Sequence, residues 1–300
     1  MLLSDGDRGG PAAALGEALT APPGRSAEGT GEAGRTRPER KRRNGGVNGD
    51  RRRVALVTGG SRGIGLAVAR ALAIAGHDVA IAARDAERAA AAVAELEGLG
   101  ARAFAVAMDV RREDDVDEAI GAIAAVLGAP LVVVNNAGVA SATPFTKLSA
   151  AEWDDALAVN ARGPFLVTRA CLPAMLETGF GRIVNVASTA ALEGVPYAAH
   201  YAASKHALLG LTRSLAREVA KKGVTVNCVC PGFVDTHMTE RSVENIVRAT
   251  GRTPEQARAA LAANSPQQRL IRPEEVASAV AYLASDAASA VNGETLVVNG

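Results

Sequence analysis

The sequence contains little cysteine, few aromatic residues and no long apolar run. Three cysteines (Cys171, Cys228 and Cys230) are too few to stabilise a chain of 300 residues through disulfides, which excludes a disulfide-based fold. Their spacing is not that of metal ligands, so we predict no metal site. They favour a reducing compartment, so we expect a cytoplasmic protein. Apolar runs such as Leu131–Val134 are far too short for a transmembrane helix.

The sequence also lacks an excess of charge of either sign, because its formal net charge is only +1. Its distribution is uneven. Residues 1–53 hold 11 Lys and Arg against 7 Asp and Glu, whereas the remaining residues hold 22 against 25. The larger part is therefore no general polyanion binder, and we expect neither nucleic acid nor membrane as its partner.

Residues 1–53 differ in kind from the rest of the chain. They contain 11 Gly, 4 Pro and no aromatic residue, a composition that cannot bury enough apolar surface to fold. We expect a disordered, dispensable tail without a signal or transit peptide. Three alternatives stay open: the basic run Arg35–Arg43 binds nucleic acid or membrane, it steers an anionic substrate carrier, or the biological start lies near Val47.

From Val54 onward, short apolar β-branched runs alternate with segments of helical periodicity. This alternation predicts a single α/β domain over residues 54–300: a doubly wound, Rossmann-type parallel sheet of about seven strands with helices on both faces. The expected strands are Val54–Thr58, Val79–Ala83, Ala103–Met108, Leu131–Asn135, Ile183–Ala187, Val224–Cys230 and Thr295–Val298. The expected helices are Ile64–Ala75, Ala86–Leu96, Glu113–Leu127, Ala151–Ala161, Pro164–Leu176, Ala202–Lys222 and Pro273–Leu283.

A glycine-rich segment lies between the first strand and the first helix. Glycines there allow a tight turn and let backbone N–H groups approach a pyrophosphate at the helix N-terminus. The strand–turn–helix context predicts a dinucleotide site rather than a simple turn. Its candidate residues are Gly59, Ser61, Arg62, Gly63, Ile64 and Gly65.

The end of the second strand indicates which dinucleotide binds. An acidic residue there would accept hydrogen bonds from the ribose hydroxyls of NAD, but the strand ends in Ala83-Arg84, with Asp85 one step later. A guanidinium suits a 2′-phosphate, and Arg62 offers a second cation. We predict NADP(H); the alternative is that both arginines are merely solvated.

A tyrosine and a lysine share one face of a predicted helix. Tyr201 and Lys205 are four residues apart, and Ser188 ends a strand 13 residues earlier. A nearby cation favours phenolate, so we expect Lys205 to lower the pKa of Tyr201. Taken alone, this spacing is common on helix surfaces. His200 and His206 flank the segment, and we interpret neither as catalytic.

Together these segments carry a more specific pattern, because they occur in one order over residues 54–300. The chain resembles the short-chain dehydrogenase/reductase family in Thr58–Gly65, Asp109-Val110, Asn135–Gly138, Asn160, Ser188, Tyr201, Lys205 and Pro231-Gly232. The resemblance implies an oxidoreductase that transfers hydride between nicotinamide and a carbonyl or secondary alcohol.

The resemblance also implies the roles of four residues. Tyr201 would be the general acid/base, Ser188 would donate a hydrogen bond to the carbonyl oxygen, and Lys205 would hold the nicotinamide ribose. Asn160 would anchor a water that links Lys205 to solvent. Further implied cofactor contacts, besides Tyr201 and Lys205, are Asp109 at the adenine, then Val110, Asn136, Ala137, Gly138, Pro231, Gly232, Val234 and Thr236.

The segment 236–272 is expected to form a helical lid over the site, which favours a bulky substrate. This segment contains four arginines, Arg241, Arg248, Arg252 and Arg258. We expect them either to bind the phosphates of an acyl carrier or to be solvated and paired with Glu240, Glu244 and Glu255. The chain is similar to bacterial 3-oxoacyl-thioester reductases and polyketide ketoreductases. It departs from the latter at Val139–Ala142 and Thr189–Ala191, which lack their glycines.

The leading hypothesis is therefore reduction of a 3-oxoacyl thioester carried on CoA or acyl carrier protein. The alternatives are a dehydrogenase of a free secondary alcohol (a sterol, sugar, terpenoid or cyclic hydroxyacyl-CoA) and a non-catalytic dinucleotide-binding protein. The resemblance implies a homodimer or homotetramer formed through Asn160–Leu176 and Tyr201–Lys222. Because the family continues past its last strand, we expect residues beyond Gly300.

Overall fold

The computed structural model describes residues 52–300, so the expected tail lies almost wholly outside the described residues. Seven strands form one parallel sheet, as predicted, and their order is β3-β2-β1-β4-β5-β6-β7. The order reverses between β1 and β4, which is where a doubly wound sheet opens a crevice for ligands. The strands are β1 (Val54–Thr58), β2 (Asp78–Ala83), β3 (Ala103–Ala107), β4 (Pro130–Asn135), β5 (Gly181–Val186), β6 (Val224–Pro231) and β7 (Thr295–Val298).

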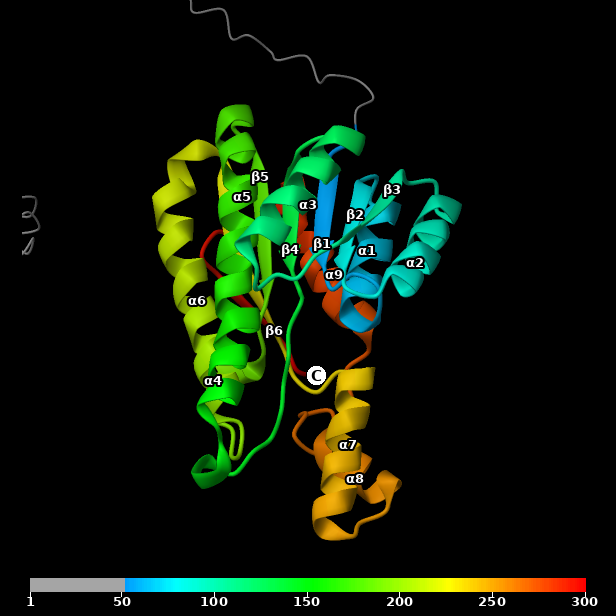
Figure 1. The fold of residues 1–300 in the computed structure, drawn as a ribbon, viewed down its shortest axis with the longest axis vertical. Helices are drawn as coiled ribbons and strands as arrows, with labels where there is room; N and C mark the ends of the chain where they lie inside the picture. The colour runs from blue at the N-terminus through cyan, green and yellow to red at the C-terminus, as the bar shows by residue number, and fades with distance from the viewer. Residues whose placement is uncertain (1–51) are drawn as a thin grey trace, which may run out of the picture. The chain divides into compact units, whose positions relative to one another are not determined.

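Helices cover both faces of this sheet (Figure 1), which confirms the three-layer expectation. Helices α1, α2 and α9 pack on one face, and α3, α5 and α6 pack on the other. These helices, with α4, are α1 (Gly63–Ile74), α2 (Ala86–Gly98), α3 (Glu113–Val126), α4 (Ala150–Leu157), α5 (Gly163–Thr178), α6 (Ala199–Val219) and α9 (Pro273–Ala284).

The inner strands are continuous apolar runs because their two faces are buried in two separate cores, whereas the edge strands β3 and β7 are only partly buried. Along β1, Leu56 packs into the core beneath α3 and α5, whereas its neighbour Val57 packs into the core beneath α1 and α9. Both side chains are fully buried. Cys228 and Cys230 are also buried, in a small cluster against α6.

Two helices differ from the expected pattern. Helix α6 begins at Ala199, so Tyr201 lies inside its first turn instead of opening it. Between α4 and α5, the chain forms a π-helical turn over Ala158–Arg162 in place of a break. The wider turn buries Asn160, and π-turns of this kind occur frequently at functional sites.

Helices α7 (His237–Thr250) and α8 (Pro254–Ala262) follow β6 and lie beyond the carboxyl ends of the strands (Figure 1). The helical structure expected of segment 236–272 is thus confirmed. Within residues 52–300, the structure holds no helix that is both long and apolar enough to span a membrane.

Two left-handed glycines at the opposite, amino-terminal edge of the sheet allow a controlled test of packing. Gly179 and Gly223 have φ of 67° and 77°. A Cβ on Gly223 would lie 2.0 Å from the Gly179 carbonyl oxygen, whereas a Cβ on Gly179 would meet nothing within 4 Å. Backbone strain is therefore shared by both positions, and the steric clash is specific to Gly223.

We expect Gly223→Ala to lower the free energy of unfolding by at least about 3 kcal/mol, because strain and clash add. Gly179→Ala serves as the control and should lower it by about 1 kcal/mol from strain alone. Urea denaturation of both variants measures the difference. Equal losses would contradict the predicted clash.

Candidate active site

The turn between β1 and α1 accepts only glycine at position 65, where the helix backbone comes closest to Gly59. A Cβ on Gly65 would lie 2.2 Å from the Gly59 carbonyl oxygen and 2.6 Å from Nδ2 of Asn136. Gly59 and Gly63 adopt positive φ. No side chain caps the N-terminus of α1, and its first turn contains no acid. The free N–H groups and the bare backbone fit a pyrophosphate.

Asn136 joins this turn to the end of β4. Its Nδ2 donates to the backbone oxygens of Thr58 (2.9 Å) and Gly59 (3.2 Å). The backbone N–H groups of Asn136 and Ala137 both donate to the Thr58 hydroxyl at 3.0 Å. Two segments 78 residues apart are thereby held side by side at the crevice.

The end of β2 and the turn between β1 and α1 each present an arginine. Arg62 and Arg84 are exposed and form no ion pair among the described residues. Asp85, the nearest acid, accepts from the Arg88 backbone as the N-cap of α2 and pairs with the Arg88 guanidinium at 3.2 Å. Both arginines are therefore available to an anion, and Asp85 is occupied as a helix cap.

Asp109 is held by an arginine that the motif search did not single out. The Arg111 guanidinium donates to both carboxylate oxygens of Asp109, from Nε to Oδ1 at 3.0 Å and from Nη2 to Oδ2 at 2.6 Å, and it also pairs with Asp155 at 2.8 Å. These bonds lower the pKa of Asp109 to about 2, so it is ionised throughout the physiological range. Asp155 lies on α4, 44 residues away, and no local sequence signal connects it with Arg111.

Two of the expected cofactor residues are part of the core. The side chain of Val110 is buried against Gly163, where a Cβ would lie 2.8 Å from Val110 Cγ2. Val234 is buried and forms a β-bridge with Ile271. Contacts of either residue with a ligand would therefore use the backbone.

The segment after β6 returns to the glycine turn. Strand β6 ends at Pro231. The next residue still contacts β7, because the Gly232 N–H donates to the Val298 oxygen at 3.0 Å. Thr236 is the N-cap residue of α7, and its side chain lies 3.4 Å from the ideal Cβ position of Gly63. The structure thus brings Thr236 to the predicted phosphate loop.

Asn160 fastens the loop after β4 to α6. Its Nδ2 donates to the Val139 oxygen (2.9 Å) and to the Ser204 hydroxyl (3.0 Å), and its Oδ1 accepts from the Val139 N–H. Gly138 lies between them, with an ideal Cβ 3.2 Å from Asn160 Oδ1 and 3.6 Å from Lys205 Nζ. The water link expected at Asn160 stays a prediction.

Ser188, Tyr201 and Lys205 converge where β5 meets α6. Lys205 donates from Nζ to the Val186 oxygen at 2.9 Å, and Nζ lies 5.8 Å from the centre of the Tyr201 ring. The Ser188 hydroxyl is near enough to the Tyr201 phenol to lower its pKa. An alcohol, a phenol and an ammonium thus share one small region.

The electrostatics correct one expectation. Burial raises the pKa of Tyr201, and this outweighs the opposing effect of Ser188, so the expected lowering by Lys205 is wrong for this structure. The reason is that Lys205 is itself buried, and its desolvation lowers its pKa to about 8 although Cys228 and Cys230 oppose the shift. Tyr201 therefore remains a protonated donor at neutral pH.

The lid is held to the domain by Arg258, which pairs with Asp235 and Glu240. Of the four lid arginines, Arg258 thus follows the surface-pairing interpretation. Arg241, Arg248 and Arg252 are exposed and form no ion pair within residues 52–300. These three remain available to an anionic group.

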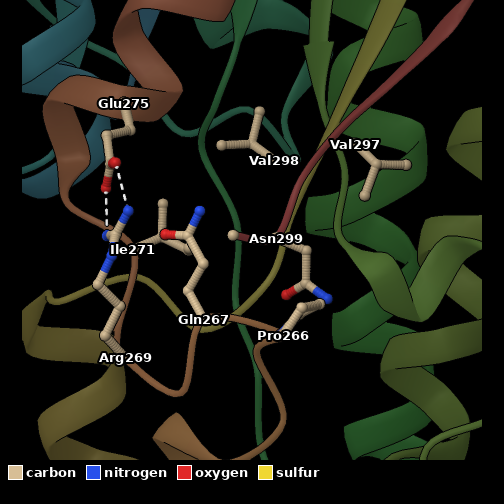
Figure 2. Close-up of a pocket in the computed structure, with 9 residues that line it drawn as sticks. Pro266, Gln267, Arg269, Ile271, Glu275, Val297, Val298 and Asn299 are labelled. Carbon is tan, nitrogen blue, oxygen red and sulfur yellow. Dashed lines mark hydrogen bonds and ion pairs between the residues drawn. The ribbon is translucent and has the colours of Figure 1, made fainter.

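A separate cavity of about 580 Å³ lies between the lid's end and β7 (Figure 2). Arg269 and Glu275 pair across its wall at 2.7 Å, which helps to lower the pKa of Glu275 to about 2. No residue predicted for catalysis or cofactor binding lines it. Among the described residues, no group of three His, Cys, Asp or Glu could hold a metal.

Comparison with known proteins agrees with this site. Residues 53–246 match the short chain dehydrogenase family, and the chain belongs to that family. It is 41% identical to a Streptomyces coelicolor protein that carries the name of a ketoacyl reductase, over 82% of this chain and 95% of that protein. It is 38% identical to the Escherichia coli 3-oxoacyl-[acyl-carrier-protein] reductase FabG, over 83% and 96%.

Solved structures give the same result. An actinorhodin polyketide ketoreductase variant with NADPH superposes with a TM-score of 0.80 at 40% identity, covering 83% of this chain and 96% of that one. Levodione reductase superposes with a TM-score of 0.79 at 33% identity, over 83% and 96%. The fold and the family are thus shown together.

The pKa of Lys205 predicts an alkaline limit to turnover. As the pH rises through about 8, Lys205 loses the proton that makes it cationic, whereas Tyr201 keeps its own because its pKa is raised. We therefore expect kcat/KM for the nicotinamide cofactor to fall about tenfold per pH unit above about 8. A pH profile measures this limb. A fall in kcat/KM that begins only near pH 10 would show that a group other than Lys205 causes it.

Proposed function

We propose that this chain is an NADP(H)-dependent reductase of 3-oxoacyl thioesters. The observation that carries the proposal is the convergence of Tyr201 and Lys205 at the end of β5, beside Ser188, together with a turn after β1 that leaves no room for a side chain at Gly65. NADPH, when bound, supplies the hydride. Tyr201 delivers the proton to the carbonyl oxygen, Ser188 donates a hydrogen bond to that oxygen, and the Lys205 ammonium orients the ribose.

The glycine turn and the two free arginines fit NADPH. Gly59, Gly63 and Gly65 leave room for the pyrophosphate at the uncapped end of α1. Arg62 and Arg84 offer guanidinium groups to the 2′-phosphate. The solved ketoreductase with NADPH supports the choice of cofactor.

Several features support a thioester. The relatives named ketoacyl reductase and 3-oxoacyl-[acyl-carrier-protein] reductase support this substrate class. The exposed lid arginines Arg241, Arg248 and Arg252 can meet phosphates of CoA or an acyl carrier. A second candidate is a free cyclic ketone, which the similarity to levodione reductase favours.

We also propose a cytoplasmic homodimer or homotetramer. Phe165 and Leu176 on α5 and Trp153 on α4 are large apolar side chains at least a third exposed, as expected of helices that associate. All three cysteines are free thiols, which suits a reducing compartment.

NADPH oxidation with acetoacetyl-CoA, against a panel of free ketones, tests the reaction. We expect turnover of the thioester with the higher kcat/KM, and a fall of roughly 10²- to 10⁴-fold in kcat for Tyr201→Phe with NADPH affinity unchanged, because only the proton donor is lost. Absence of turnover with every carbonyl would refute the proposal. A preference for free ketones would select the second candidate.

Arg84→Ala tests the choice of cofactor. Losing a charge-assisted bond to the 2′-phosphate should weaken NADPH binding roughly 10- to 100-fold and leave NADH binding unchanged. Arg88→Ala is the matched control, because Arg88 is an exposed arginine of the same segment that pairs with Asp85. Titration of both cofactors measures the ratio; equal losses for NADPH and NADH would reject the role.

A further inference from the structure

A buried histidine supports an exposed serine beside the catalytic region. The Nε2 atom of His200 lies 2.7 Å from the Ser141 hydroxyl oxygen. His200 is 2% exposed and directly precedes Tyr201 in α6. Ser141 is exposed and follows Gly138, whose ideal Cβ lies 3.6 Å from Lys205 Nζ. His200 thus neighbours Tyr201 in α6, and Ser141 lies three residues after the glycine that approaches Lys205; neither belongs to the hydride-transfer machinery.

The surroundings of the imidazole determine the direction of this bond. Nδ1 of His200 is buried and has no hydrogen-bond partner among the described residues. An orphaned buried N–H is rarer and more costly than a lone pair left without a donor. The ring hydrogen therefore belongs on Nε2, which donates to the Ser141 oxygen. The hydroxyl hydrogen of Ser141 then points away from His200 and is free for an incoming molecule.

The loop that carries Ser141 is fixed on both sides. Before it, the Val139 N–H donates to Asn160 Oδ1 at 2.9 Å. After it, the Thr143 hydroxyl donates to Glu152 at 3.0 Å and the Thr143 N–H donates to the Tyr197 oxygen at 2.7 Å. Ser141 therefore keeps its position without a ligand, which reduces the entropic cost of a contact with substrate.

We propose that Ser141 donates a hydrogen bond to the thioester carbonyl of the substrate and that His200 is the positioning residue that directs it. This inference rests on the proposed function. A 3-oxoacyl thioester carries two carbonyl oxygens, and Tyr201 and Ser188 serve only the one that is reduced. The second oxygen would lose its water on binding, so leaving it without a donor would cost affinity.

Two CoA substrates isolate the second oxygen. Acetoacetyl-CoA contains it, and S-(3-oxobutyl)-CoA replaces that carbonyl by a methylene while keeping the ketone. We expect Ser141→Ala to lower kcat/KM roughly 3- to 10-fold for acetoacetyl-CoA and to leave the thioether unchanged. His200→Phe should show the same selective loss, because it removes the donor to Ser141.

Conservative variants and a control complete the design. His200→Gln retains an N–H that can reach Ser141, so it should recover part of the selectivity that His200→Phe loses. His206→Phe is the control, since His206 is an exposed histidine of the same helix. NADPH affinity and the urea midpoint report whether each variant is folded.

The outcomes separate the two proposals. Equal losses for both substrates in Ser141→Ala would overturn the role of Ser141 while leaving the reductase function intact. Loss in His200→Phe alone would overturn the coupling of the pair. Turnover of neither substrate by the wild-type protein would overturn both this inference and the proposed function.

Discussion

The contact of Asn136 with the backbone of Thr58 and Gly59 brings together the parts of the site. It lies at the switch point between β1 and β4, just beyond the carboxyl ends of these two paired strands. The same amide nitrogen lies so near Gly65 that no side chain fits there. The position of the phosphate turn relative to the loop after β4 thus depends on the side chains of Asn136 and Thr58 and on the absence of a side chain at Gly65.

Desolvation controls the protonation of Lys205 and Tyr201 more than their mutual attraction does. Burial moves the pKa of Lys205 down and that of Tyr201 up. A phenol that holds its proton suits delivery of that proton to a carbonyl. In this chain, the helix spacing brings the two groups together, and the surrounding core determines their protonation.

The fold was predictable because each strand carries a local signal, namely a short apolar run, which is fully buried in all strands except the two at the edges and one position of β4. The glycine turn, Ser188, Tyr201 and Lys205 were predictable because the resemblance supplies their order. The bonds between Arg111 and Asp155, and between Ser141 and His200, were not, since they join segments 44 and 59 residues apart. The raised pKa of Tyr201 escaped prediction for a related reason: spacing reveals a neighbouring charge but not how much water surrounds it.

The π-helical turn over Ala158–Arg162 separates two helical registers. Because an α-helix advances about 100° per residue, the extra residue in the wider turn rotates everything before it relative to everything after it. Helix α5 can therefore align with the sheet while α4 aligns with α6, although they are continuous in the chain. Shortening the turn by one residue would keep a helix but swing Asn160 away from Val139 and Ser204. The length of this segment, and not only its composition, is thus a requirement of the site.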